Sequence, residues 1–132
     1  MAITVKRDLS GAMRHIVHIG DHAFAVDEPP ANGGEDTGPS PHDIYDAALG
    51  ACKALTLVWY AKRKGIPLED VEVTVERDAS QEKEGLYRLR TLLALGGDLS
   101  EAQRQQLLSV ASRCPVHKLM TEVKTEVETA WK

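Results

Sequence analysis

The apolar positions of the chain are densest between residues 44 and 61, a run that contains only two charged side chains. A helix-start pattern precedes it: Ser40 is a favoured N-cap, Pro41 suits the first helical position, and Asp43 completes a capping box. Three basic residues at 62–64 complement the negative end of the helix dipole, and a glycine and a proline follow them closely. The pattern predicts one long, central and buried helix, because the run is apolar on most faces.

Three short segments before this helix alternate between apolar and polar positions, as half-buried strands do. They span residues 2–7, 13–19 and 22–26, and the glycine and aspartate at 20–21 are typical of a hairpin turn. We therefore expect a small antiparallel meander. Residues 27–40 are rich in glycine, proline and acidic side chains, which predicts a loop, and its length indicates that it borders a site.

The chain after the helix predicts two strands, two helices and a last strand. Valines alternate with polar residues over 71–76, and a returning strand follows at 87–95. Ser100 begins a second capping box and a helix with an apolar stripe. Pro115 interrupts that helix and opens a short one, and alternating valines predict a final strand at 121–129.

The predicted order of elements is βββ-α-ββ-αα-β. The strands are grouped rather than alternating with the helices, which is typical of the α+β class. The chain is long enough for a real core, so we expect a single domain over residues 1–132. A central helix that is apolar nearly all round must be covered on all sides, and a homodimer that packs two such helices together would cover it.

Charge and composition narrow the classes of function. The net charge of −4 argues against nucleic acid or an anionic membrane as partner. The N-terminus has no apolar leader region, and no apolar run reaches the roughly 20 residues that a membrane span needs. We therefore expect a cytoplasmic protein whose two cysteines stay reduced by default. In that setting cysteines are more often redox-active, metal-binding or core residues than structural disulfides.

The two cysteines lie in different contexts. Cys52 is in the middle of the predicted long helix, where it is either a small buried hydrophobe or a reactive thiol. Lys53 follows it but points about 100° away around the helix. Cys114 is expected at a helix N-cap, with Arg113 before it and His117 one turn later, and these neighbours lower the pKa of a thiol. The residues alone therefore favour Cys114 as the more acidic thiol, although an ordinary cap beside a helix-breaking proline remains the alternative.

The sequence gives weaker indications of a metal site, a phosphate-binding loop or a catalytic triad. Cys114 and His117 have the spacing of metal ligands and Cys52 would add a third, but no fourth ligand completes a structural zinc site. No phosphate-binding glycine loop and no arrangement of serine, histidine and aspartate is visible. The other histidines are scattered along the chain: His15, His18, His22 and His42. We therefore expect no metal and no cofactor.

Four stretches of the sequence resemble the OsmC/Ohr family, the osmotically induced and organic-hydroperoxide-resistance proteins of bacteria. They are Thr-Gly-Pro-Ser-Pro at 37–41, Ala-Leu-Gly-Ala-Cys at 48–52, Tyr-Ala-Lys-Arg-Lys-Gly at 60–65 and Arg-Cys-Pro-Val-His at 113–117. The resemblance covers nearly the whole chain, including the order of elements, and is nearest to the broader OsmC-like branch.

The resemblance implies an intertwined homodimer with two active sites at the subunit interface. It also implies a thiol-dependent peroxidase of oxidative-stress defence that reduces organic hydroperoxides. Cys52 would attack the peroxide as a thiolate and become a sulfenic acid, and Cys114 would condense with it to a disulfide. A dithiol such as a lipoylated protein would then regenerate both thiols.

The chain departs from the family at two positions. Peroxidatic members carry a glutamate on the central helix where this chain has His42, and the adjacent Asp43 is the candidate carboxylate. They also carry an arginine that activates the first thiol, and of Arg7 and Arg14, which alone precede the helix, we assign this role to Arg14. These departures motivate a second hypothesis, a non-catalytic relative that binds a small apolar ligand at the dimer interface.

Overall fold

The computed structural model describes residues 1–132, which divide into two compact units, Met1–Tyr45 and Asp46–Lys132. The boundary between the units falls within the long helix α1 (Pro41–Lys64), which begins at the predicted position and ends at the predicted basic residues. The expected single domain over the whole chain stays a prediction. No helix combines the length and the apolar character that crossing a membrane requires.

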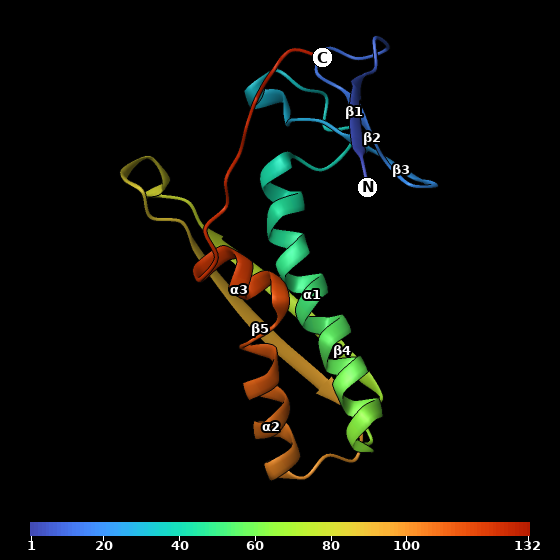
Figure 1. The fold of residues 1–132 in the computed structure, drawn as a ribbon, viewed down its shortest axis with the longest axis vertical. Coiled ribbons are helices and arrows are strands. Elements are labelled where there is room, and N and C mark those ends of the chain that lie inside the picture. Colours follow the sequence, from blue (N-terminus) through green and yellow to red (C-terminus); the bar gives the residue numbers. More distant parts are fainter. The chain divides into compact units, whose positions relative to one another are not determined.

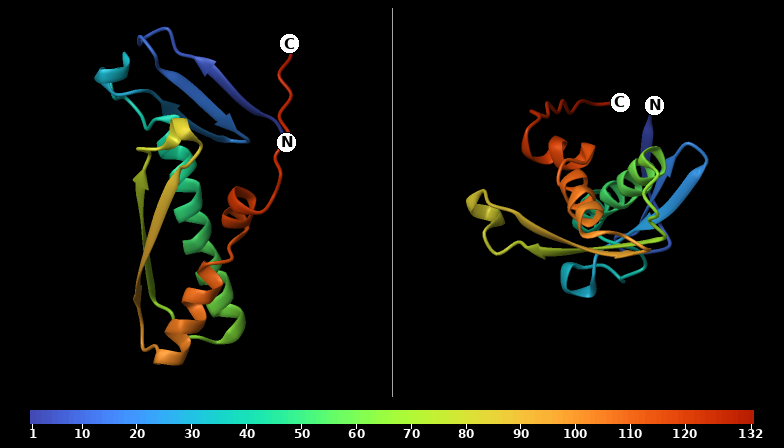
Figure 2. Two further views of the ribbon diagram at one scale, coloured as in Figure 1. Left: turned by 90° about the vertical axis from the view of Figure 1, so that its left-hand side faces the viewer. Right: turned by 90° about the horizontal axis from the view of Figure 1, so that it is seen from below.

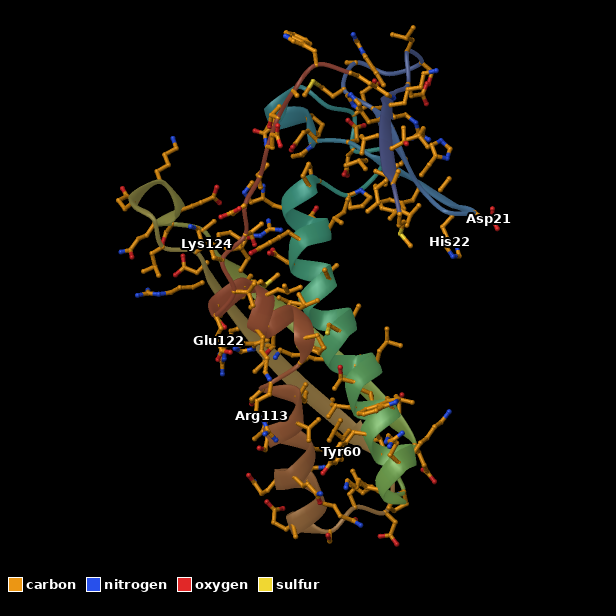
Figure 3. The ribbon with its side chains drawn as sticks, in the orientation of Figure 1. Asp21, His22, Tyr60, Arg113, Glu122 and Lys124 are labelled. Atoms are coloured by element: carbon orange, nitrogen blue, oxygen red, sulfur yellow. The ribbon has the colours of Figure 1, made fainter.

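The first unit contains an antiparallel meander of three strands, as the alternating pattern predicts. The strands are β1 (Ile3–Arg7), β2 (His15–Ile19) and β3 (His22–Val26), and β2 pairs with both of the others (Figure 1). Gly20 opens the predicted turn between β2 and β3 with φ of +57°, a left-handed conformation that costs glycine little. Asp21 stands at the tip of this hairpin (Figure 3).

The loop between β3 and α1 is organised around one buried carboxylate, that of Asp27. Its oxygens accept hydrogen bonds from the backbone amides of Glu28 at 2.8 Å and of Glu35 at 3.3 Å. Thr37 donates twice, from its hydroxyl at 2.5 Å and from its amide at 3.1 Å. The loop also includes a short 3₁₀ turn at Pro30–Asn32. Led by the Thr37 hydroxyl, these donors lower the pKa of Asp27 to about 2, so the loop is a built structure rather than a bare connector.

The second unit is a two-stranded antiparallel sheet with helices on one face. The strands are β4 (Asp70–Asp78) and β5 (Arg88–Gly96), joined through a 3₁₀ turn at Glu82–Glu84. The helix α2 (Glu101–Ala111) lies beside α1 on the same face of the sheet (Figure 2), and the short α3 (Pro115–Thr121) follows it. All of these elements match the sequence prediction to within a few residues.

The core of the second unit lies between α1, α2 and the sheet. Its buried members come from both helices and from the turn after α1: Leu57, Ala61, Ile66, Leu107 and Ala111. Gly50 brings α1 close to β4, because a Cβ atom at this position would lie only 2.9 Å from Cγ2 of Val75. A glycine inside the helix is thus explained by the close approach of helix and strand.

The single chain does not bury α1 on all sides, and the homodimer expected to cover the rest of the helix stays a prediction. Both charged residues of the apolar run lie on its buried face together with apolar residues such as Leu57, and Asp46 is only 6% and Lys53 only 2% exposed. Apolar residues face outward instead: Leu55 is 71%, Trp59 58% and Val58 40% exposed. The physical reason is that one chain supplies a sheet and α2 for one face of the helix and nothing for the other.

The predicted last strand at 121–129 is absent. The helix α3 continues to Thr121, and residues 122–132 form an exposed tail without strand pairing (Figures 1 and 2). Glu122 and Lys124 mark the start of this tail (Figure 3). The valines do alternate with charged residues here, but a strand requires a neighbour to bond with its backbone, and within the chain this segment pairs with none.

Candidate functional site

The structure brings Cys52 and Cys114 together. Cys52 projects from α1, and Cys114 occupies the predicted N-cap of α3, where Pro115 starts the new helix. The backbone N–H of Val116, in the first turn of α3, donates to Sγ of Cys52 over 3.4 Å. Both cysteines are free thiols; Cys114 is completely buried, whereas Cys52 is partly exposed. A small molecule can therefore reach Cys52 more easily than Cys114.

The prediction that the surroundings of Cys114 lower the pKa of its thiol is wrong. Burial raises the pKa of the Cys114 thiol above its ordinary value, and the neighbouring Cys52 raises it further. The backbone N–H of His117 and the positive charge of Lys53 act in the opposite direction but do not outweigh burial. The N–H of His117 makes no capping hydrogen bond of good geometry with the Cys114 side chain, so the stabilisation expected from the N-cap is weak.

Arg113, which the sequence places beside Cys114, does not face it. Its side chain is exposed, and its Nε donates to the carbonyl oxygen of Ser109 over 3.3 Å, back along α2 (Figure 3). Its position next to Cys114 in the sequence does not bring its charge to the thiol, because the chain turns between α2 and α3 and the two side chains point in different directions.

Lys53 is the functional candidate that sequence reasoning missed. Its side chain is 2% exposed, and its Nζ donates to the carbonyl oxygen of Ala111 over 2.6 Å. The same Nζ lies 3.0 Å from Nδ1 of His117. The angle of about 100° does separate Lys53 from Cys52 around the helix, but it directs the lysine toward the Cys114 side of the site. The available signal was a single lysine inside an apolar run, since lysine is almost never fully buried without a partner.

The contact between Lys53 and His117 is relevant to the hypothesis that His117 binds a metal ion. A lysine Nζ only donates hydrogen bonds, so Nδ1 of His117 is the acceptor and is engaged by a cationic group. No three or more histidine, cysteine, aspartate or glutamate side chains gather in a way that could hold a metal ion. The hypothesis of a metal bound by Cys52, Cys114 and His117 therefore has no geometric support.

Arg14 and Asp43 both have clear partners within the first unit. Arg14 donates from Nε to Asp8 over 2.9 Å and from Nη1 to the carbonyl oxygen of Thr37 over 3.2 Å. Asp43 and Ser40 form the predicted capping box of α1, with reciprocal hydrogen bonds of 3.0 and 3.2 Å. The roles of Arg14 and Asp43 toward the thiols stay predictions.

A second polar cluster that the sequence did not reveal lies on the buried face of α1. The carboxylate of Asp46 accepts a hydrogen bond from Nε of Arg77 over 2.5 Å and from the hydroxyl of Tyr87 over 2.7 Å. Burial and the hydrogen bond to Asp46 raise the pKa of Tyr87 to about 12. The three residues come from α1, from β4 and from the position just before β5, so the cluster connects the helix to the sheet.

The sequence matches a known family. A family model described as OsmC-like protein matches residues 33–129, a stretch that contains both cysteines. The chain belongs to the OsmC-like protein family, as the resemblance of its motifs predicted. No curated protein matches the sequence.

Several solved structures share the fold of this chain. The OsmC-like protein from Mycoplasma pneumoniae is 20% identical, with a TM-score of 0.72 over 92% of this chain and 87% of that chain. An organic hydroperoxide resistance protein from Elizabethkingia anophelis is 23% identical, with a TM-score of 0.67 over 92% of this chain and 89% of that one. The organic hydroperoxide resistance protein OhrB of Bacillus subtilis is also 23% identical, with a TM-score of 0.62 and coverage of 92% and 90%. These likenesses confirm the α+β, OsmC-like fold.

Proposed function

We propose that this protein is a thiol-dependent peroxidase that reduces organic hydroperoxides through Cys52 and Cys114 in the defence against oxidative stress. The observation that carries the proposal is the meeting of a partly exposed thiol with a completely buried one, next to the buried amine of Lys53. Names of similar proteins agree with it, since two of the structural neighbours are organic hydroperoxide resistance proteins.

The different exposures of the two thiols fit two different roles, attack on the peroxide by Cys52 and disulfide formation by Cys114. The Cys52 thiolate attacks one peroxide oxygen, the O–O bond breaks, and the alcohol leaves with a proton, so that Cys52 becomes a sulfenic acid. The Cys114 thiol then attacks the Cys52 sulfur, the S–O bond breaks, and water leaves as the disulfide forms. The N–H of Val116 donates to Sγ of Cys52 and holds this sulfur in place for the first step.

Regeneration requires a second substrate. The disulfide is reduced by thiol–disulfide exchange with an external dithiol, and we propose a lipoylated protein or a similar dithiol for this step. The Cys52 sulfur is the expected point of attack, since Cys114 is completely buried.

The surroundings of Cys52 support an organic rather than an inorganic peroxide. The outward face of α1 beside Cys52 carries a stripe of apolar residues at helical spacing, which we call the apolar stripe: Ala48, Ala51, Leu55, Val58 and Trp59. An apolar surface of this kind favours a substrate with a hydrocarbon part, because contact removes both from water.

The apolar stripe also supports a homodimer. A contiguous exposed apolar surface usually marks an interaction site. A second copy that lays its own stripe against this one would form a symmetric interface, and Cys52 would then lie at its edge. The substrate would reach the thiol between the two subunits.

The decisive experiment is the intact mass of the reduced protein after brief exposure to one equivalent of cumene hydroperoxide under non-reducing conditions. We expect the loss of two hydrogens, and we expect Cys52→Ser to abolish the reaction. Cys114→Ser should instead gain one oxygen atom and react with dimedone, because its Cys52 sulfenic acid has no thiol to condense with. An unchanged mass with peroxide still in solution would overturn the proposal and favour the alternative, a non-catalytic family member that binds an apolar ligand.

A further inference from the structure

Lys53 is a buried cationic residue without a carboxylate partner. Its hydrogen-bond acceptors are both uncharged groups, the carbonyl oxygen of Ala111 and Nδ1 of His117. None of the ion pairs of the chain includes it, although its side chain is only 2% exposed. A buried charge is costly unless an opposite charge compensates it. An anion that forms next to Lys53 during the working cycle would supply the missing opposite charge.

The groups around Lys53 identify that anion. They come from the two helices packed beside Lys53: the carbonyl oxygen of Ala111 at the end of α2, the His117 ring of α3, and the thiol of Cys114 at the N-cap of α3. Among these only the Cys114 thiol becomes negatively charged near neutral pH. The charge of Lys53 acts on the Cys114 thiol directly, in the direction that favours the thiolate.

We propose that Lys53 is the positioning residue that stabilises the Cys114 thiolate for disulfide formation, and that His117 holds the lysine amine in place. This deepens the proposed function and rests on it for the reaction step. Cys114 gives up its proton and its sulfur attacks the sulfur of the Cys52 sulfenic acid. The S–O bond breaks, the S–S bond forms, and the departing oxygen takes the proton and leaves as water. Lys53 would thus supply the positive charge that a thiolate needs at the buried position of Cys114.

A purely structural role for Lys53 makes a different prediction. The carbonyl oxygen of Ala111 lies in the last turn of α2, where carbonyl groups lack partners within the helix and the helix dipole is negative. A donor of any charge would satisfy this group. The structural role therefore requires a hydrogen-bond donor at position 53, whereas the proposed role requires a positive charge.

Two substitutions separate these roles. Lys53→Gln keeps a hydrogen-bond donor without the charge, and Lys53→Met removes both while keeping an unbranched side chain. We expect both variants to fold, because replacing a buried charge by a neutral side chain is often neutral or stabilising. Lys62→Met, at the exposed end of the same helix, is the matched control for the loss of one lysine.

The first readout requires no peroxide. The pKa of Cys114 is measured from the ultraviolet absorbance of its thiolate in the Cys52→Ser background, after subtraction of a protein that lacks both cysteines. We expect Lys53→Gln and Lys53→Met each to raise this pKa by about one unit, equivalent to about tenfold less thiolate at a given pH, and Lys62→Met to leave it unchanged. An unchanged pKa in folded Lys53→Gln would overturn the proposal.

The second readout follows the reaction. With cumene hydroperoxide in a single turnover, Lys53→Gln should form the Cys52 sulfenic acid at nearly the normal rate but convert it to the disulfide about tenfold more slowly. Dimedone trapping during the reaction measures that delay. If the unmodified protein does not react with peroxide at all, the proposed function fails, while a raised Cys114 pKa in Lys53→Gln still establishes the electrostatic link. If the sulfenic acid forms and resolves equally fast in the variant, the role in disulfide formation fails alone.

Discussion

Arg77 and Asp46 meet across the buried face of α1, where Nε of the arginine donates to a carboxylate oxygen over 2.5 Å. Tyr87 donates to the other oxygen of the same carboxylate. The aspartate is the more enclosed partner of the ion pair, with its side chain 9% exposed against 32% for the arginine. Since Asp46 lies in the helix that also carries Cys52, this cluster fixes that helix against the two-stranded sheet.

We expect the Asp46 carboxylate to contribute measurably to stability. Asp46→Ala removes the acceptor of two hydrogen bonds at a buried position, so the free energy of unfolding should fall by about 2 kcal/mol, measured by urea denaturation. Tyr87→Phe removes one neutral donor and should cost about 1 kcal/mol. Equal stability of Asp46→Ala and the unmodified protein would show that Arg77 and Tyr87 gain as much from water as from the carboxylate.

The close approach of α1 to β4 at Gly50 determines whether Gly50→Ala raises or lowers the free energy of unfolding. Alanine favours a helix interior over glycine by about 1 kcal/mol. Its Cβ at position 50, however, would lie 2.9 Å from Cγ2 of Val75, and overpacking of this kind costs typically about 1–3 kcal/mol. We expect Gly50→Ala to be destabilising overall in urea denaturation.

A double-mutant cycle isolates the contact between Gly50 and Val75. In a Val75→Ala background the obstructing methyl group is gone, so Gly50→Ala should be neutral or stabilising there. The change of sign is the informative result. A Gly50→Ala effect of the same size in both backgrounds would mean that Val75 is not what keeps the helix position small.

Local signals explain why most of the fold was predictable from the sequence. The capping boxes begin α1 at Ser40 and α2 at Ser100, where both hydrogen bonds with Gln103 are present at 3.0 and 3.1 Å. Pro115 and Gly20 likewise act through their own backbone. Each of these features depends on residues within one turn of the chain, so the pattern alone locates it.

What the sequence missed depends on contacts between distant residues. The segment 121–129 alternates like a strand, but pairing is a property of a neighbouring strand and not of the segment itself. The pKa of Cys114 depends on how deeply the tertiary structure buries it, which outweighs its place at a helix N-cap. Lys53 meets His117 only because α3 packs back against α1. The candidate site was therefore predicted as the two cysteines with Arg14 and Asp43, without the lysine that lies beside Cys114.

The carboxylate of Asp27 predicts a pH dependence of stability. Its pKa in the folded protein is about 2, against an ordinary value of 3.8, so the ionised form is favoured by folding. This stabilisation is fully present above the ordinary pKa and is lost as the pH falls from about 4 to about 2. Asp27→Asn lacks it, so the variant should melt at a lower temperature near neutral pH.

Comparing the melting temperatures of the unmodified protein and Asp27→Asn isolates the contribution of Asp27, because all other carboxylates are the same in both proteins. We expect the gap in melting temperature between the unmodified protein and Asp27→Asn to narrow steadily over that acidic range. Thr37→Val should behave partly like Asp27→Asn, because the Thr37 hydroxyl is the largest cause of the lowered pKa, and Thr37→Ser should retain the gap. A constant gap at all pH values would mean that Asp27 acts by shape and not by charge.

The apolar stripe on α1 makes the homodimer testable. Leu55 is 71% exposed in the single chain and lies at the middle of the stripe, so Leu55→Arg would place a charge in an interface of two stripes. An unpaired buried charge is strongly unfavourable, and the dimer should dissociate at concentrations at which the unmodified protein is dimeric. Light scattering after size-exclusion chromatography measures the mass of each species. Gln105→Arg, which adds the same charge at an exposed position of α2, should leave the mass unchanged. A protein that is monomeric before any substitution would refute the dimer outright, and a dimer that survives Leu55→Arg would place the interface on another face of the chain.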